Sequence, residues 1–189
     1  MKAIYHRNDP IIFESNPLWT GAEKYGLAIG AGVLWDQLEA AGIQDVVGVW
    51  EHSPYMKVVS IRQRYAGHAK QAGHAAMSCA AGAYNGRYVV VVDEDIDPTD
   101  LKEVLWAMMT RVDPETDIET VGGCWSTPLD PRMSPEKREG HDFTNSQAII
   151  YAVRPFAWMG KFPQVSRTER DLRREVVEKY RSVLPFPGR

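Results

Sequence analysis

The sequence predicts an α/β fold, a layered domain with a mixed or mostly parallel sheet flanked by helices. Residues 88–92 form a fully apolar, β-branched run, which is typical of a central strand covered on both faces. Helical and strand patterns alternate along the chain, as in layered α/β domains. The 189 residues are 44% hydrophobic and 25% charged, which fits a single globular domain over 1–189.

The first third of the chain predicts one helix, two strands and a second helix. Thr20 and Glu23 fit a capping box, and apolar residues follow at near-helical spacing up to Gly42, which offers a C-cap. Two β-branched runs, 46–50 and 58–61, flank a turn-like Ser-Pro pair and predict neighbouring strands. Alanine and glycine then dominate residues 66–76, which predicts a helix packed closely against a sheet.

The middle of the chain predicts a strand, a turn and an amphipathic helix. The run 88–92 ends in a cluster of carboxylates. Asp97 is the expected N-cap, with Pro98 at the first helical position. Apolar residues from Leu101 to Val112 recur at helical spacing, so one face of this helix should be buried.

The last third predicts two further strands, a long loop and a terminal helix. Residues 118–121 and 148–153 have strand patterns, whereas 128–141 contains three prolines and is expected to be a surface loop. Residues 167–180 predict a C-terminal amphipathic helix, whose apolar stripe comprises Leu172, Val176, Val177 and Tyr180. The segment 165–189 is therefore a candidate oligomer contact.

Charge and cysteine content exclude several classes of function. The net charge of −3 provides no positive field for nucleic acid or for an acidic membrane surface. No apolar run reaches the roughly 18 residues that a membrane-spanning helix needs. Cys79 and Cys124 have no CxxC partner and no leader segment is evident, so we expect a reduced, cytoplasmic protein.

Three sets of residues are candidates for chemistry. The carboxylates after the central strand could hold Mg²⁺, although a helix cap and an exposed turn account for them equally well. Arg62 follows a predicted strand, where a cation could meet a substrate carboxylate. Aromatic walls with a few polar groups suit a planar ligand, and such residues stand at turns or strand ends. They are Trp50, Glu51, His52, Trp125, Thr127 and His141.

Several segments together resemble the UbiD family of decarboxylases. The segments are 64–70, 89–97 and 103–114, with an opening at 6–11 that resembles the start of that family's C-terminal domain. Residues 142–145 resemble the family's Asp-x-Thr-Asn motif. Members of the family are reversible carboxy-lyases for aromatic or α,β-unsaturated acids. They use prenylated flavin mononucleotide with a divalent metal, Mn or Mg, and potassium.

The resemblance implies a C-terminal lid that closes over a flavin held elsewhere. In the family, the flavin, its metal and the catalytic arginine and acidic residues belong to preceding segments, which include a Glu-Gly-Pro-Phe-Gly-acid motif that this sequence lacks. We therefore expect no catalytic, cofactor-binding or metal-binding residue in this chain and no cofactor bound by it alone. Its expected partners are an upstream flavin-binding domain or subunit, a second copy through the C-terminal helix, and a small aromatic acid.

Approximate alignment with the family gives the expected pocket positions. They are Val47, Trp50, Glu51 and His52, the run Trp125 to Thr127, and His141. We hypothesise that His141, with Glu51 or His52, hydrogen-bonds a ring substituent such as a phenolic hydroxyl, because a hydrocarbon ring would favour aliphatic neighbours.

Two other functions remain open from the sequence. One is a non-catalytic interaction module, in which the terminal helix docks on another copy of the chain. The other is a stand-alone Mg²⁺-dependent α/β enzyme that uses Asp93 and Asp95.

Overall fold

The computed structural model describes Ala3, Tyr5, 7–9, 29–166, 170–181 and 183. The predicted capping box at Thr20 and Glu23 lies outside these residues, and so does half of the family-like opening at 6–11. The first helix of the described chain, α1, spans Ile29–Ala40.

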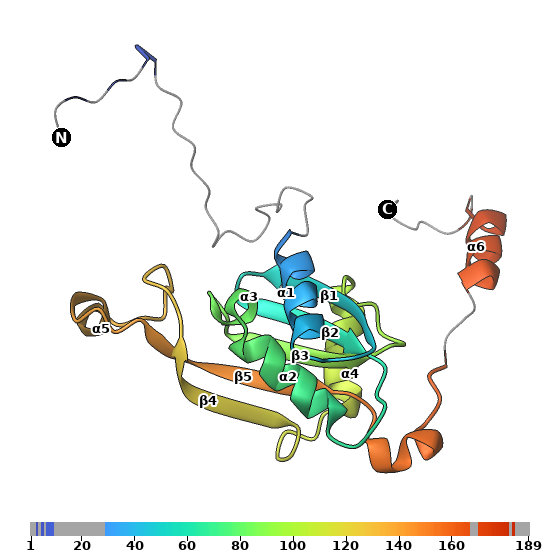
Figure 1. Cartoon of the computed structure of the whole chain (residues 1–189). Helices are drawn as coiled ribbons and strands as arrows, with labels where there is room; N and C mark the ends of the chain where they lie inside the picture. The colour runs from blue at the N-terminus through green and yellow to red at the C-terminus, as the bar shows by residue number, and fades with distance from the viewer. Residues whose placement is uncertain are drawn as a thin grey trace.

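A five-stranded mixed sheet forms the centre of the molecule, and it confirms the predicted fold class (Figure 1). Its strands are β1 (Val46–Ser53), β2 (Met56–Ile61), β3 (Tyr88–Asp93), β4 (Ile118–Trp125) and β5 (Thr144–Ala152). The order across the sheet is β1-β2-β3-β5-β4. The three central strands are parallel, whereas β1 and β4 run antiparallel to their neighbours at the two sides.

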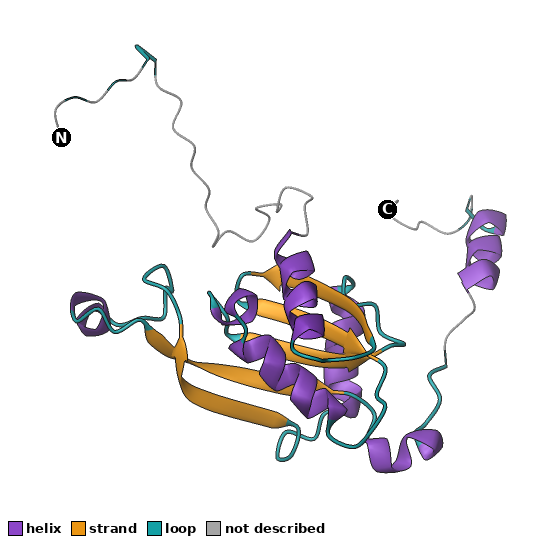
Figure 2. Ribbon diagram, viewed as in Figure 1, coloured by secondary structure: helices purple, strands orange, loops and turns teal. Residues whose placement is uncertain are grey.

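Helices cover both faces of the sheet (Figure 2). Helices α1 and α2 (His68–Ser78) and the short α3 (Ala80–Ala83) lie on one face, and α4 (Leu101–Arg111) lies on the other. The predicted close packing of the small-residue helix is confirmed at Gly73, where an added Cβ would stand 2.7 Å from Ile149 Cγ2. The apolar run of β3 is buried between the two helix layers.

The helix after β3 begins later than predicted. Its N-cap is Asp100, whose carboxylate accepts a hydrogen bond of 2.8 Å from the Lys102 N–H. The prediction of Asp97 as the cap was wrong. The Asp97 carboxylate accepts instead from the N–H and hydroxyl of Thr99, which forms an Asx turn. The helix therefore begins only at Leu101.

Two ends of the sheet are distinguished below. The amino end is where the parallel strands begin, and the carboxyl end is where they finish. Because β1 and β4 run the opposite way, their last residues, Ser53 and Trp125, lie at the amino end. The loop after β4 also lies there and contains the short helix α5 (Pro135–Glu139).

The chain after β5 forms the 3₁₀ helix η1 (Phe156–Lys161) and helix α6 (Arg170–Lys179). Figure 1 shows α6 standing apart from the sheet. Leu172 and Val176 on α6 and Tyr180 directly after it recur every four residues, and all three are exposed. Among the described helices, none is long and apolar enough to cross a membrane.

Candidate functional site

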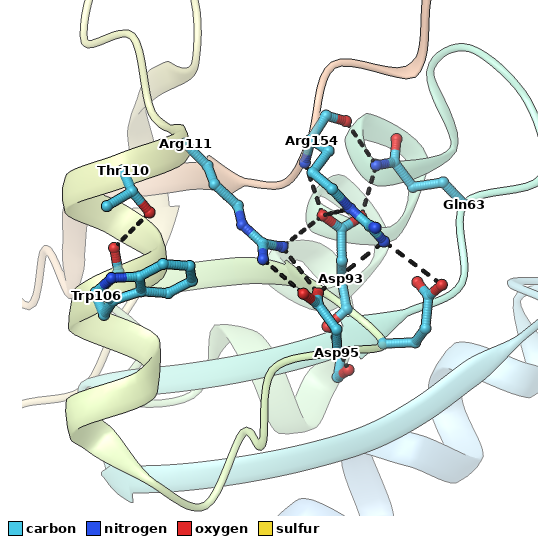
Figure 3. Close-up of polar contacts among 9 residues, drawn as sticks. Gln63, Asp93, Asp95, Trp106, Thr110, Arg111 and Arg154 are labelled. Atoms are coloured by element: carbon cyan, nitrogen blue, oxygen red, sulfur yellow. Dashed lines mark hydrogen bonds and ion pairs between the residues drawn. The ribbon is translucent and has the colours of Figure 1, made fainter. Parts of the chain in front are cut away.

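The carboxyl end of the sheet is occupied by a buried ionic network (Figure 3). The Asp93 carboxylate is fully buried and accepts hydrogen bonds from Gln63 Nε2 at 2.7 Å, Arg111 Nη1 at 2.8 Å and the Arg154 N–H at 2.7 Å. Asp95 receives two bonds from the same Arg111 guanidinium, at 2.9 and 2.7 Å. The oxygens that a magnesium ion would need are therefore already bound by arginine.

This network joins the ends of four elements. Gln63 follows β2, Asp93 ends β3, Arg111 ends α4 and Arg154 follows β5. Burial raises the pKa of Asp95, but its hydrogen bonds and ion pair with Arg111 outweigh burial and leave the pKa below its usual range. The acidic cluster is thus a structural tie, and the alternative of a magnesium enzyme using Asp93 and Asp95 has no support from its geometry.

The amino end is open and carries exposed aromatic side chains. Tyr84, Tyr88 and Trp125 are each about half exposed, at 47%, 46% and 53%, and Leu129 is 68% exposed. The rings of Tyr84 and Trp125 are 5.6 Å apart and tilted against each other. Large apolar side chains gathered at one end of a domain indicate a surface that is covered in function.

A hollow of about 360 Å³ opens beside this aromatic surface. Its size falls within the usual range of small-molecule sites. Apolar side chains and one acidic–basic pair form its walls, which come from α1, the β1–β2 hairpin and the α3–β3 turn. The lining residues are Gly30, Val33, Glu51, Pro54, Lys57, Ala80, Ala81, Tyr84 and Asn85.

Glu51 is held against the first turn of α1. A Cβ at Gly30 would meet the end of the Glu51 side chain, so the carboxylate lies directly against the helix backbone at this glycine. Lys57 Nζ lies 3.9 Å from Glu51 Oε1 and donates a 2.8 Å hydrogen bond to the Pro54 carbonyl, while its side chain is only 1% exposed. The hollow therefore presents a carboxylate backed by a buried ammonium group, an arrangement that accepts hydrogen bonds from a ligand.

Neighbouring residues of β1 face opposite sides of the sheet, and this separates the predicted site residues. Glu51 faces the hollow, whereas His52 Nε2 lies 2.9 Å from the Pro98 carbonyl, on the side of α4. Trp50 pairs with Val58, whose side chain belongs to the core under α4. Of the three adjacent candidates, only Glu51 lies in the hollow.

Two other predicted residues lie at the far end of the sheet. Val47 is near the start of β1 and Arg62 directly follows β2, so both stand at the carboxyl end. The Arg62 side chain is exposed, and its N–H donates to the Asp45 carbonyl at 3.0 Å. The structure does not bring these two residues to the hollow.

The remaining candidates lie at the amino end in different roles. Trp125 contacts Tyr84, which lines the hollow. Thr127 is only 1% exposed, and its hydroxyl accepts from the Leu129 N–H at 3.2 Å, so it shapes a turn. His141 follows α5 on the loop that projects beyond β4 and β5 in Figure 1; it is exposed, and its ring is 6.0 Å from that of Phe143.

The sequence reasoning missed the residue that organises this loop, Asp130. Its carboxylate is 1% exposed and accepts hydrogen bonds from Arg87 Nη2 at 2.5 Å, Ser126 Oγ at 3.1 Å, the Arg132 N–H at 2.9 Å and Asn145 Nδ2 at 2.5 Å. Burial raises the pKa of Asp130, but these donors lower it by more than burial raises it, so the pKa lies below its usual range. One signal was available, since Asn145 ends the Asp-x-Thr-Asn motif.

Arg87 extends the same network to the β1–β2 hairpin. Its guanidinium lies 5.6 Å from the centre of the Tyr55 ring, and the Tyr55 hydroxyl is 3.5 Å from the Leu129 carbonyl. We call the set Tyr55, Arg87, Asp130 and Asn145 the amino-end network. It connects the β1–β2 hairpin, the start of β3, the loop after β4 and the start of β5. The ionic network at the carboxyl end connects the other ends of the central strands. The molecule is thus an α/β domain with a candidate ligand-binding face at its amino end.

Comparison with known families agrees with this description. The profile of the 3-octaprenyl-4-hydroxybenzoate carboxy-lyase C-terminal domain, UbiD_C, matches residues 26–152. The chain belongs to this family, and the resemblance inferred from its motifs is confirmed.

Curated relatives include two phenolic acid decarboxylases. The protein of Bacillus subtilis (strain 168) is 37% identical over 142 residues, which cover 71% of this chain and 29% of the relative. The protein of Sedimentibacter hydroxybenzoicus is 36% identical over 139 residues, which cover 70% of this chain and 28% of the relative. The chain therefore spans less than a third of the length of these relatives.

Solved structures show the same relation. The UbiD-class enzyme HmfF from Pelotomaculum thermopropionicum, in complex with FMN, has a TM-score of 0.63 and 28% identity, with 75% of this chain and 31% of that chain covered. The closed form of Sedimentibacter hydroxybenzoicus vanillic acid decarboxylase has a TM-score of 0.58 and 30% identity, with 81% and 31% covered. Each neighbour contains this domain as a minor part of a longer chain.

Proposed function

We propose that this chain, as one domain over 1–189, is the lid and oligomerisation domain of a reversible decarboxylase. Its substrate would be an aromatic acid, including hydroxylated ones, or an α,β-unsaturated acid. The observation that carries the proposal is the hollow at the amino end, where Glu51 stands beside an exposed aromatic surface in a member of the UbiD family. This end would form one wall of the substrate pocket.

The electrostatic character of the hollow supports a phenolic substrate. The Glu51 carboxylate, near Lys57, lines the hollow and is placed to accept a hydrogen bond from a ring hydroxyl, which an unsubstituted ring does not offer. The rings of Tyr84 and Trp125 offer an apolar wall for a planar ligand. His141 stays a candidate second contact to the ring substituent, reached from its exposed loop.

The cofactor belongs to another part of the proposed enzyme. Two neighbours are complexes of HmfF with FMN or prenylated FMN, and both contain much longer chains. Within the described residues no group of three His, Cys, Asp or Glu side chains could hold a metal ion. Following the family resemblance, we place the flavin, its divalent metal, the potassium ion and the catalytic arginine and glutamates on an upstream domain or subunit. The prenylated flavin would supply the electron sink for decarboxylation.

The terminal helix is the proposed contact between copies of the chain. Leu172 and Val176 on α6, with Tyr180 directly after it, form an exposed apolar stripe, and a ten-residue helix is marginal in water unless such a stripe packs against something. The segment 165–189 would thus serve homo-oligomerisation. The two cysteines, both free thiols, are compatible with a reducing compartment, and we place the protein in the cytoplasm.

The proposal is tested by an activity assay on a combined enzyme, in which this chain is joined to the flavin-bearing upstream part of a relative. Decarboxylation by the combined enzyme is measured. We expect turnover of 4-hydroxybenzoic acid to fall about 10-fold in Glu51→Gln, because a neutral amide accepts a weaker hydrogen bond than a carboxylate. Turnover of benzoic acid should change less than twofold. Glu115→Gln, an exposed carboxylate on the loop before β4, is the matched control.

Two results would contradict the proposal. One is that the combined protein decarboxylates none of these acids. The other is that Glu51→Gln lowers turnover of both acids equally, which would remove the carboxylate from ring recognition. His141→Leu is compared in the same way, and an equal effect on both acids would exclude it as the second contact.

A further inference from the structure

The amino-end network suggests a role for a residue that never faces the hollow. We propose that Asp130 is a positioning residue, which holds segment 125–129, beside the hollow, in one conformation and so places the Trp125 ring against Tyr84. The inference rests on the proposed function, because it concerns the same pocket. It adds Asp130, and Arg87 as its ionic partner, to the residues that determine substrate binding.

The first argument is the number and origin of the hydrogen bonds to Asp130. Four donors reach one nearly inaccessible carboxylate, and they come from the start of β3, the end of β4, the following loop and β5. A buried carboxylate with this many donors is costly to move, since each bond lost would leave a desolvated donor or acceptor. Asp130 therefore fixes the loop relative to the strands.

The second argument is what lies next to this fixed point. The Asp130 N–H donates to the Thr127 carbonyl at 3.0 Å, and its carbonyl accepts from Arg138 Nη2 at 2.8 Å and from the Met133 N–H at 3.2 Å. The tight turn 127–130 that results presents Leu129 to solvent and follows directly on Trp125 at the end of β4. Displacing Asp130 would displace these apolar side chains.

The third argument is the connection from Asp130 to the hairpin that lines the hollow. Arg87 binds Asp130 and also lies over the Tyr55 ring, and Tyr55 belongs to the same β1–β2 hairpin that carries Glu51 and Lys57. The aromatic wall and the carboxylate wall thus have a common attachment. A loss of Asp130 should alter how well a ring fits between them and leave the bond-breaking step on the flavin unchanged.

Asp130 also lies outside the apolar core, so its loss is separable from unfolding. Neither of the two core clusters, which sandwich the sheet under α2 and α4, includes a residue of the 125–133 turn region. The carboxyl-end network remains intact at the other end of the strands. A variant that loses the network should keep the sheet and change only the amino end.

The experiment compares Asp130→Asn with Asp142→Asn, an exposed carboxylate of the same loop that binds Lys137 and Thr144. In the combined enzyme we expect Asp130→Asn to raise KM for 4-hydroxybenzoic acid about 10-fold, with kcat within about twofold of the parent. Asp142→Asn should leave both constants unchanged. Arg87→Gln should change KM less in the Asp130→Asn background than in the parent, because the two residues share one ion pair.

A second measurement uses this chain alone and does not depend on activity. Hydrogen exchange should become at least 10-fold faster at amides 126–133 in Asp130→Asn, with the amides of β3 and β5 still protected. Ser126→Ala, which removes one donor to Asp130, should show a smaller increase in exchange in the same segment. It replaces Asp130→Asn in this measurement if Asp130→Asn does not fold.

The outcomes separate the two proposals. Faster exchange at 126–133 with an unchanged KM would overturn the positioning role and leave Asp130 purely structural. Unchanged exchange would overturn the inference directly. If the parent combination has no activity, the proposed function fails, and the exchange data alone decide whether Asp130 orders the loop.

Discussion

Replacing Asp93 by asparagine tests whether the carboxyl-end network holds the fold together. Asparagine keeps one oxygen, which can still accept from Arg111 and Arg154, but it removes the charge that balances two guanidinium groups. The Arg111 side chain is fully buried and retains only Asp95 as an ionic partner. Losing one member of a buried ion pair costs about 3 to 5 kcal/mol of unfolding free energy. Because Arg111 keeps Asp95 as a partner, we expect a loss of about 3 kcal/mol for Asp93→Asn.

The control is Asp95→Asn. The Asp95 carboxylate is 35% exposed, so water can solvate the groups that lose their ion pair in this variant. We expect a loss of about 1 kcal/mol there, as for partly exposed pairs. Urea denaturation followed by far-UV circular dichroism measures both variants. With a dependence on urea of about 2 kcal/mol per molar, Asp93→Asn should lower the midpoint by about 1.5 M. Equal midpoints for the two variants would refute the assignment of Asp93 as the central charge.

Three further predictions follow from packing, titration and the terminal helix. Gly73→Ala should lower the free energy of unfolding by about 1 to 3 kcal/mol in thermal denaturation, because its Cβ would overlap Ile149. The pKa of Asp130 is lowered in the folded protein, so its charge stabilises the fold above its unfolded pKa of about 4. This stabilisation should be lost as the pH falls through the lowered pKa. The difference in unfolding free energy between the parent and Asp130→Asn should then vanish. Val176→Glu should shift any oligomer towards monomer in analytical ultracentrifugation, without changing the circular dichroism of the sheet.

The sheet could be predicted because local patterns carried enough information. The apolar run of β3 needs cover on both faces, and the small residues of α2 need a close neighbour. The predicted strands were too short where polar residues continue the pairing. Glu51 and Ser53 belong to β1 although neither is apolar, because their backbone groups pair with Lys57 and Met56.

The candidate site was harder to predict, because its contacts join distant parts of the chain. Asp93 meets Arg154 from 61 positions away, and no spacing rule suggests that partner. Strand alternation, by contrast, was available: Glu51 and His52 are adjacent, so both could not face one pocket. Whether Trp50 and Trp125 lie on a common surface could not be decided from the sequence, because that depends on the direction and facing of β1 and β4.

The reversed outer strands divide the molecule into two ends with separate tasks. In an open parallel sheet, ligands usually bind where the strands finish, but here the arginine and aspartate side chains at that end are paired with one another. Since β1 and β4 deliver their last residues to the other end, loops there can vary in length and composition without touching the ties that hold the strands. A domain built this way can acquire a new substrate preference at one end while its stability is maintained from the other.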